Sequence, residues 1–254
     1  MGSNWPEGVG REVFQTLDST NAEAIRRAST GTRGPIWFLT HEQTQSRGRR
    51  GRPWDSGKGN FSASLLFRPE GGPEQAALRS FIAALALRDA LVEVCGREDI
   101  FSLKWPNDVL LNNRKLAGIL LESGSDASGA YLCIGIGVNL ANEPDASFVE
   151  DGALAPISLR SVIGTEIEPE AFLSSLAAAY DRWETQFQQY GFAPIRTEWL
   201  NHATRLGEVI TAKLMDRTEV GTFETVDETG AIVLRTPKGL LHLPAAEIYF
   251  GTEG

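Results

Sequence analysis

The sequence predicts an α+β protein in which helices flank a mixed or antiparallel sheet and a small β-rich module ends the chain. Residues 73–96 and 168–191 carry the apolar spacing of amphipathic helices. Short apolar and β-branched segments lie before and between these helices, as strands do. From Leu206 onward the segments are short, β-branched and separated by Asp, Gly and Pro, which is typical of a small antiparallel sheet or barrel. We therefore predict a body over residues 1–204 and a β module over residues 205–254.

The first helix is expected near the N-terminus, in the segment LDSTNAEAIRRA. Thr20 precedes Glu23 by three residues, which is the spacing of a capping box at a helix start. Ala24, Ile25 and Ala28 would then form the inner face of this helix.

Four stretches of the body predict strands. PIWFLTHEQT at 35–44 is typical of a buried strand, and FSASLLF at 61–67 alternates apolar and small polar residues as a half-buried strand does. KWPNDVLLNNRKLAGILLE at 104–122 predicts two strands joined by the asparagine pair at 112–113, because asparagine tolerates left-handed geometry. YLCIGIGVNL at 131–140 predicts another strand.

The two long helices have clear ends, and shorter elements follow them. The segment 73–96 opens with proline and closes with glycine, as helices commonly do. A shorter helix is expected near IRTEWLNHA after the helix at 168–191. Strands of the C-terminal module are expected in GEVITAKLM, VGTFETVDETGAIVLRT and KGLLHLPAAEIYF.

Composition and charge narrow the class of protein. The chain has 254 residues, of which 42% are hydrophobic and 22% charged, so it is globular and long enough to bury a large core. Its net charge of −9 disfavours a surface devoted to nucleic acid, which usually makes a whole domain basic. The first residues lack an apolar signal core, and no apolar run is long enough to span a membrane. We expect a soluble, cytoplasmic protein that binds neither membranes nor nucleic acid.

The cysteines and histidines do not form a recognisable catalytic or metal-binding pattern. Cys95 and Cys133 are far apart and fit neither a zinc spacing nor a disulfide framework, so buried free thiols are expected. His41, His202 and His242 lie in different predicted elements, with no nucleophile or ligand pattern around them. Structural roles are therefore favoured for all three.

Two stretches of the sequence match nucleotide-binding motifs only in part. GRPWDSGKG resembles a phosphate-binding loop, but five residues separate Gly51 from Gly57 where four are required, and glycine follows Lys58 in place of Ser or Thr. GIGVNL has two of the three glycines of a dinucleotide fingerprint. Neither motif therefore supports its usual ligand.

The stretch QSRGRRGRPW at 45–54 concentrates positive charge in an acidic chain. Its four arginines surround two glycines. Arginine guanidinium groups bind phosphate and carboxylate through paired hydrogen bonds, and neighbouring glycines let backbone amides approach an anion. An anion-binding loop and a solvated basic loop are both compatible with this pattern.

Polar residues cluster again in KWPNDVLLNNRKLAG. Pro106 stiffens a turn, Asp108 supplies a carboxylate, and Lys104 and Lys115 bring two ammonium groups to one hairpin. A surface hairpin with no ligand is the alternative.

The glycines of GIGVNL predict that the backbone of this strand lies close to a ligand or to another part of the protein. Gly135 and Gly137 leave room for this approach, and Asn139 offers an amide. A tightly packed strand crossing would explain the glycines equally well.

Five stretches in this order resemble the biotin–protein ligases. They are STN at 19–21, EQTQSRGRRGRPW at 42–54, KWPND at 104–108, RKLAGILLE at 114–122 and GIGVNL at 135–140. The resemblance runs from about residue 13 to the end of the chain. It implies a class II synthetase-like ligase core and an SH3-like C-terminal β-barrel domain. Because these motifs begin within twenty residues of Met1, we expect the monofunctional type without an N-terminal DNA-binding domain.

One position departs from the family pattern. The usual form of the arginine loop is GRGRRGR, and Ser46 stands where its first glycine would be. We expect a loop that is somewhat less flexible at this point, with unchanged chemistry.

The resemblance implies an ATP-dependent reaction in two steps. Biotin would be activated to biotinyl-5′-AMP, with Mg²⁺ neutralising the polyphosphate of ATP. A lysine of a biotin carboxyl carrier domain, from acetyl-CoA carboxylase or a related carboxylase, would then accept the biotinyl group. Whether the protein forms a homodimer is left open. A lipoate–protein ligase of the same broad fold and a nucleic-acid-binding module are the competing interpretations.

The resemblance also implies roles for individual residues. Lys115 and Arg49 are expected to be catalytic, and Asp108 is the candidate for a metal contact. The expected biotin-binding residues are Ser19, Thr20, Asn21, Gln43, Arg47, Gly48, Arg49, Lys115 and Gly118. The expected nucleotide-binding residues are Arg49, Arg52, Trp54, Lys104, Asn107, Asp108, Lys115 and Asn139, with Trp54 against the adenine.

Overall fold

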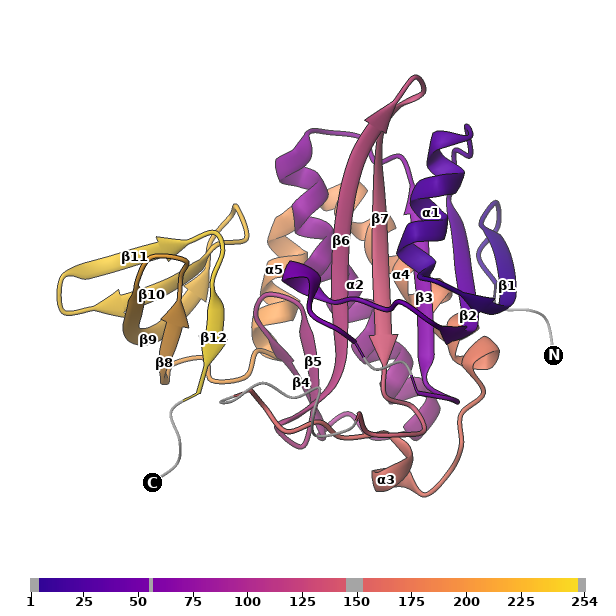
Figure 1. Cartoon of the computed structure of the whole chain (residues 1–254). Coiled ribbons are helices and arrows are strands. Elements are labelled where there is room, and N and C mark those ends of the chain that lie inside the picture. Colours follow the sequence, from indigo (N-terminus) through magenta and orange to yellow (C-terminus); the bar gives the residue numbers. More distant parts are fainter. Residues whose placement is uncertain (1–4, 55–56, 145–152, 251–254) are drawn as a thin grey trace.

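The body of the protein is built on one seven-stranded mixed sheet (Figure 1). The computed structural model describes residues 5–54, 57–144 and 153–250. The strand order is β1-β2-β3-β7-β6-β5-β4; β1 and β2 are parallel and the other neighbours are antiparallel, so the predicted α+β class is confirmed. The strands are β1 (Gly10–Leu17), β2 (Ile36–Gln43), β3 (Phe61–Phe67), β4 (Phe101–Lys104), β5 (Asp108–Leu111), β6 (Arg114–Asp126) and β7 (Gly129–Val138).

Helices cover both faces of this sheet. They are α1 (Thr20–Ser29), α2 (Pro73–Cys95), α3 (Arg160–Ile163), α4 (Pro169–Tyr190) and α5 (Phe192–Asn201), and a 3₁₀ turn spans Arg49–Gly51. In Figure 1, α1 lies in front of the sheet, and α2 and α4 lie behind it. Successive strand residues face opposite sides, so Phe38, Leu66 and Cys133 pack with Ala24 and Ala28 of α1. Their strand neighbours join the larger cluster under α2 and α4.

The start of α1 differs from the prediction by one residue. Ser19, and not Thr20, is the N-cap, with an extended φ of −157° and a side chain that accepts a hydrogen bond from the Ala22 N–H at 3.4 Å. Thr20 is therefore the first helical residue and is buried. Ile25 is only half-buried, whereas Thr20, Asn21, Ala24 and Ala28 form the buried face of the helix.

The predicted half-buried strand, β3, is buried over its whole length. It lies between β2 and β7, and both of its faces are covered. On one face, Phe61 meets Phe172 of α4 with ring centroids 5.0 Å apart. On the other face, the Ser64 hydroxyl lies 2.7 Å from the Thr20 hydroxyl of α1. The small polar residues of this strand therefore mark a covered polar face and not a solvent face.

Both predicted hairpin strands form, but the two edge strands of the sheet were not predicted. Asn112 and Asn113 have φ values of 49° and 60°, so the asparagine turn takes the expected left-handed geometry. The missed strands are β1, in which half-buried and exposed positions alternate and none is fully buried, and β4, which has four residues. Edge strands pair on one side only and often lack a long apolar run.

The C-terminal module is a five-stranded antiparallel sheet of order β11-β10-β9-β8-β12. Its strands are β8 (Val209–Lys213), β9 (Thr218–Val226), β10 (Ile232–Thr236), β11 (Gly239–Leu243) and β12 (Glu247–Tyr249). Figure 1 shows it beside α5, β4 and β5. One hydrophobic cluster extends from the body into this sheet, and the Trp105 indole N–H donates to the Gly230 carbonyl at 3.1 Å. The boundary between residues 204 and 205 stays a prediction.

Both cysteines are free thiols, as expected, but only one is fully buried. Burial raises the pKa of Cys133 above its usual value, with Glu122 adding to the shift, whereas Cys95 is half-buried. In the described part of the chain, no helix has the length and apolar character needed to cross a membrane.

Candidate active site

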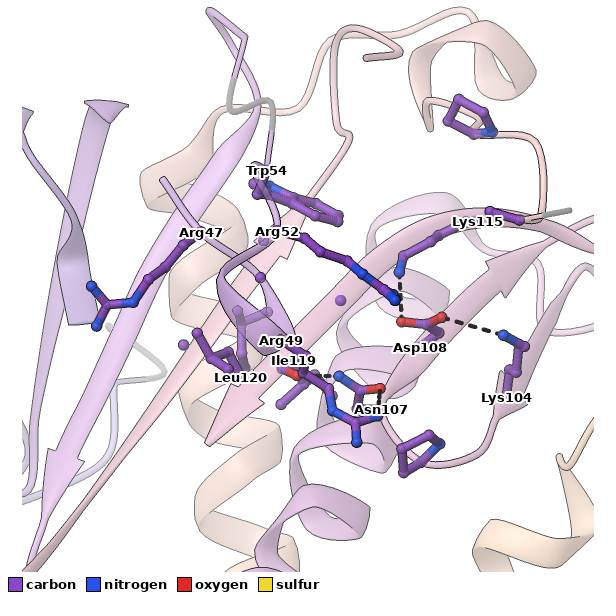
Figure 2. A pocket seen from close by; sticks show the side chains of 18 of the residues that line it. Arg47, Arg49, Arg52, Trp54, Lys104, Asn107, Asp108, Lys115, Ile119 and Leu120 are labelled. Atoms are coloured by element: carbon purple, nitrogen blue, oxygen red, sulfur yellow. Dashed lines mark hydrogen bonds and ion pairs between the residues drawn. The ribbon is translucent and has the colours of Figure 1, made fainter. Parts of the chain in front are cut away.

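A pocket of about 480 Å³ lies on the sheet face that carries α1. Segments far apart in the sequence form it: the start of α1, the end of β2, the arginine loop, the β4–β5 turn, β6, β7 and β12. Figure 2 shows many of these side chains. Every residue that the sequence assigned to biotin or nucleotide lines the pocket, namely Ser19, Thr20, Asn21, Gln43, Arg47, Gly48, Arg49, Arg52, Trp54, Lys104, Asn107, Asp108, Lys115, Gly118 and Asn139.

The pocket floor is made of glycine-rich strand backbone. A Cβ atom on Gly137 would lie 2.6 Å from the Trp54 indole nitrogen, closer than real Cβ contacts allow. A Cβ atom on Gly135 would collide with the Asn21 amide. A Cβ atom on Gly118 would meet the Trp54 ring at 3.4 Å, an ordinary contact distance. The glycines of GIGVNL therefore admit two specific side chains, which explains the close approach that the sequence indicated.

The wall at the start of α1 is a hydrogen-bonded polar network. The Thr20 backbone N–H donates to the Gln43 side-chain oxygen at 2.8 Å. The Asn21 amide donates to a Glu122 carboxylate oxygen at 2.7 Å and accepts a hydrogen bond from the Ser64 hydroxyl. Because protein groups engage both ends of the Asn21 amide, its orientation is fixed.

The arginine loop is a small hairpin, with the 3₁₀ turn Arg49–Gly51 at its tip. Arg47 and Pro53 form an antiparallel bridge, and the Gly48 N–H donates to the Arg52 carbonyl at 2.7 Å. We call residues 46–54 the arginine hairpin. Its backbone pairing gives the glycine-rich stretch a defined shape.

The side chains of the arginine hairpin reach different parts of the molecule. Arg47 pairs with Glu122 at 2.8 Å and points away from the lysines of the pocket in Figure 2. Arg52 pairs with Glu247 of β12 at 2.5 Å. Arg49 lies 3.5 Å from the Asn107 side-chain oxygen. Burial lowers the pKa of Arg49, although nearby Asp108 acts in the opposite direction.

Two lysines face one carboxylate at the centre of the pocket (Figure 2). Lys115 Nζ lies 2.8 Å from Asp108 Oδ1, and Lys104 Nζ lies 3.8 Å from Asp108 Oδ2. Burial alone would raise the pKa of Asp108, but Lys115 and Lys104 outweigh it and lower that pKa below its usual value. Burial lowers the pKa of Lys104, partly offset by Asp108. Two ammonium groups and a guanidinium thus surround this carboxylate, which suits the pocket to an anion.

The far end of the pocket contains an unsatisfied acceptor. The Asn139 side-chain N–H donates to the Ile157 carbonyl at 3.2 Å. Its Oδ1 atom is buried and has no hydrogen-bond partner among the described residues. Buried polar atoms are nearly always paired, so this oxygen is a candidate contact for a ligand N–H donor.

Several residues of the site were not found from the sequence. Glu122 ends the RKLAGILLE stretch but was given no role, and Ser64 was assigned only to a strand. Glu247 lies on β12 and Phe250 follows it directly, and the Phe250 ring centroid lies 5.6 Å from Lys104 Nζ as a cation–π partner. The position of Glu122 in a named motif could have indicated it, whereas no local pattern marks the C-terminal residues.

The histidines lie outside the described lining of this pocket. Each has a carboxylate neighbour. Glu170 lies 3.7 Å from His41, Glu198 lies 3.0 Å from His202, and Asp227 lies 2.7 Å from His242. These local pairs fit the structural roles that the sequence favoured.

Comparison with known proteins agrees with this architecture. The chain matches the model of the biotin/lipoate A/B protein ligase family over residues 13–139 and that of the biotin protein ligase C-terminal domain over residues 206–251. It is 51% identical over 240 residues to the biotin–[acetyl-CoA-carboxylase] ligase of Paracoccus denitrificans. This alignment covers 94% of this chain and 100% of the relative. The bifunctional ligase/repressor BirA of Escherichia coli (strain K12) is 29% identical over 231 residues, covering 90% of this chain and 70% of the relative.

Solved structures share the same fold. The biotin protein ligase from Aquifex aeolicus in complex with biotin and ATP has a TM-score of 0.81 at 24% identity, covering 94% of this chain and 97% of that chain. The chain therefore belongs to the biotin/lipoate A/B protein ligase family, and to the biotin–protein ligases within it. The family resemblance carried by the five motifs is confirmed.

Proposed function

We propose that this protein uses ATP to activate biotin and transfers it to a specific lysine of a biotin carboxyl carrier domain. In the first step, a biotin carboxylate oxygen bonds to the α-phosphorus of ATP, and the bond from that phosphorus to pyrophosphate breaks. In the second step, the lysine amine attacks the carbonyl carbon of biotinyl-5′-AMP, the bond to the AMP oxygen breaks, and the amine loses a proton. The grouping of Lys104, Lys115 and Arg49 around Asp108 is the observation that carries this proposal.

Biotin binds at the α1 end of the pocket in this proposal. Its ureido ring offers one acceptor and two N–H donors, which suit the polar wall formed by Ser19, Thr20 and Gln43. Asn21 supports this wall through its bonds to Ser64 and Glu122. The glycine floor at Gly118 and the neighbouring hairpin residues Arg47 and Gly48 complete the biotin site.

The nucleotide occupies the rest of the pocket. Asn139 Oδ1 accepts a hydrogen bond from the adenine amino group, which would satisfy its buried lone pairs. Arg52, Lys104 and Asn107 serve the phosphates and ribose. The Trp54 indole offers a flat face near Lys115, whose Nζ lies 5.7 Å from the ring, and packs against a ring of the bound ligands.

Lys115 and Arg49 carry the chemical step. The biotin carboxylate and the α-phosphate of ATP are both negatively charged and must approach each other. The charge on the phosphate oxygens must also be stabilised as the pyrophosphate leaves. Asp108 holds the Lys115 ammonium at 2.8 Å, so the cation is placed before the substrates arrive. The partly buried Arg49 acts where water screens its charge less.

Mg²⁺ would neutralise the polyphosphate when bound with ATP. Mg²⁺ usually keeps several waters and takes one or two protein carboxylates besides the phosphates. Asp108 is the carboxylate of this pocket that lies among the phosphate-binding candidates, and it would keep its ion pair with Lys115. Among the described residues no cluster of three or more His, Cys, Asp or Glu side chains is arranged for a metal, so the phosphates would supply most of the ligands.

The acceptor in this proposal is the carrier domain of acetyl-CoA carboxylase or a related carboxylase, and the protein acts in the cytoplasm without nucleic acid. Whether it acts as a homodimer is a separate question, which ultracentrifugation with and without ligands would answer.

The decisive experiment compares biotin with lipoate in ATP–pyrophosphate exchange. We expect exchange that depends on biotin, followed by transfer to a carrier domain with a single acceptor lysine. A carrier domain with that lysine replaced by arginine is the matched control and should stay unlabelled. Exchange that depends on lipoate and not on biotin would reject the proposal.

A further inference from the structure

The polar wall of the pocket contains three short oxygen–oxygen contacts around two hydroxyl groups. The Ser64 hydroxyl lies 2.7 Å from the Thr20 hydroxyl and closer still to the Asn21 side-chain oxygen. The Thr20 hydroxyl in turn lies 3.2 Å from the Gln43 side-chain oxygen. Each hydroxyl has one hydrogen, so only two of the three contacts can hold a hydrogen bond at one time. The positions of these two hydrogens therefore decide which atoms of the wall accept and which donate.

Glu122 fixes the first hydrogen by fixing the Asn21 amide. Asn21 Nδ2 lies 2.7 Å from a Glu122 carboxylate oxygen and 3.4 Å from the Leu120 carbonyl oxygen. Both of these groups only accept hydrogen bonds, so the amide nitrogen must face them and the amide oxygen must face Ser64. Arg47 pairs with the same carboxylate and leaves it an acceptor. Because the amide oxygen has no hydrogen, the contact between Ser64 and Asn21 must contain the hydrogen of Ser64.

The second hydrogen is the one on Thr20. Once Ser64 donates to Asn21, its oxygen can only accept from Thr20 across the 2.7 Å that separates the two hydroxyls. The Cys133 thiol also contacts Ser64, but sulfur is a weak acceptor and does not compete. The contact between Thr20 and Gln43 then holds no hydrogen, which agrees with its being the longest of the three. The Gln43 oxygen is kept in place by the Thr20 backbone N–H at 2.8 Å, so two acceptor oxygens lie side by side in the wall.

A ligand N–H is the group that this pair of oxygens lacks. Thr20 and Gln43 both line the pocket, and a donor placed against them would form hydrogen bonds where two acceptors otherwise face each other. A ring oxygen in the same place would meet only acceptors. Thr20 could turn its hydrogen toward such an oxygen only by giving up its bond to Ser64. The wall therefore favours a ring that offers N–H groups.

We propose that Ser64 is a positioning residue that directs the Thr20 hydrogen away from the ligand and so selects rings with N–H donors. The ureido ring of biotin has such donors, whereas the dithiolane ring of lipoate has none. Ser64 is 0% exposed, so it acts through Thr20 and not by touching the ligand. The chain of hydrogen bonds from Glu122 through Asn21 and Ser64 to Thr20 comes from α1, β3 and β6, and it does not depend on the conformation of the arginine hairpin. This inference rests on the proposed function and adds to it the group that sets specificity.

The test measures a ratio of two affinities in each protein. Isothermal titration calorimetry gives the Kd for biotin and for the two cyclic carbamates in which a ring oxygen replaces one or the other ureido N–H. We expect the parent to bind at least one carbamate roughly tenfold more weakly than biotin. Ser64→Ala frees the Thr20 hydrogen to meet that ring oxygen, so the ratio of the carbamate Kd to the biotin Kd should fall roughly three- to tenfold. An unchanged ratio, even if both ligands bound more weakly, would indicate a purely structural serine and overturn the proposal.

The same strand supplies a matched control. Ser62 lies two residues before Ser64, on the same face of β3, and it is also buried. Its hydroxyl has no hydrogen-bond partner among the described residues, so Ser62→Ala should keep the ratio of the parent. Ser64→Cys keeps a weaker donor and should give a ratio between those of the parent and Ser64→Ala. If circular dichroism shows that Ser64→Ala has lost its fold, the ratio of Ser64→Cys decides.

A double variant tests the route of the effect. Thr20→Val removes the hydroxyl through which Ser64 acts, with little change in volume. In this background Ser64→Ala should leave the ratio unchanged, and a further fall would show that Ser64 acts by another route and contradict the inference. If the parent did not bind biotin, the proposed function would fail together with this inference. Biotin binding with a ratio that Ser64→Ala does not move would reject this inference alone.

Discussion

Replacing Lys115 with glutamine tests the central electrostatic argument. The variant keeps most of the side-chain volume but removes the ammonium group that lies 2.8 Å from Asp108. Two unit charges 4 Å apart attract by about 4 kcal/mol at an effective dielectric constant of about 20. The Lys115 side chain is 34% exposed, so water screens part of this attraction.

The expected loss is therefore smaller than the full Coulomb energy. Removing one preorganised donor from a site of developing negative charge typically costs roughly 100- to 1,000-fold in kcat, or about 2.7–4 kcal/mol. We expect Lys115→Gln to fall near the lower end of this range, because Lys104 stays 3.8 Å from the same carboxylate.

Biotin-dependent pyrophosphate exchange at saturating biotin and ATP measures this effect on kcat. Lys238→Gln changes an exposed lysine of the C-terminal sheet in the same way and should behave as the parent. A fall of less than about tenfold in kcat for Lys115→Gln, with the control unchanged, would refute the assignment of Lys115 to the chemical step.

Three further predictions follow from the site. Gly137→Ala should displace Trp54, shift its fluorescence and raise the KM of exchange by roughly tenfold, since overpacking costs about 1–3 kcal/mol. Gly118→Ala should change the fluorescence and the KM less, and equal effects of the two substitutions would contradict the packing argument. Glu247→Gln removes the carboxylate that pairs with the hairpin arginines and should speed amide hydrogen exchange in residues 47–52; protection equal to that of the parent would count against this tether. Asp108 has a lowered pKa in the folded state, so its stabilisation is full above about pH 4 and is lost as the pH falls through the folded-state pKa. The difference in unfolding free energy between the parent and Asp108→Asn should thus stay constant from about pH 7 to 5 and shrink below about pH 4, and a difference that vanished above pH 5 would contradict it.

Local chemistry explains which parts of the site could be predicted. Lys104, Asp108 and Lys115 belong to one turn and the hairpin that follows it, so their spacing along the chain already limits their separation in space. The same holds for the asparagine turn and for the proline and glycine ends of α2. In these cases backbone preferences and tertiary structure agree.

Long-range packing explains what was missed. Glu122 on β6 pairs with Arg47, which lies 75 residues earlier in the chain. Glu247 on β12 pairs with Arg52, about 200 residues earlier, so only the tertiary fold brings these carboxylates to the arginine hairpin. The burial of β3 depends on cover from both α1 and α4, which its own alternation could not reveal. Ser19 caps α1 in place of Thr20, whose hydroxyl instead points inward and lies 3.2 Å from the Gln43 side-chain oxygen.

The strand β12 and the residue that follows it give the pocket a wall, in which Glu247 contacts Arg52 and Phe250 contacts Lys104 of the body. Ligand binding and the docking of this sheet are therefore thermodynamically linked: each must favour the other by the same free energy. A ligand at about 100 times its Kd stabilises the form that binds it by about 2.7 kcal/mol. Occupancy of the pocket should thus be measurable as resistance of the whole C-terminal sheet to unfolding.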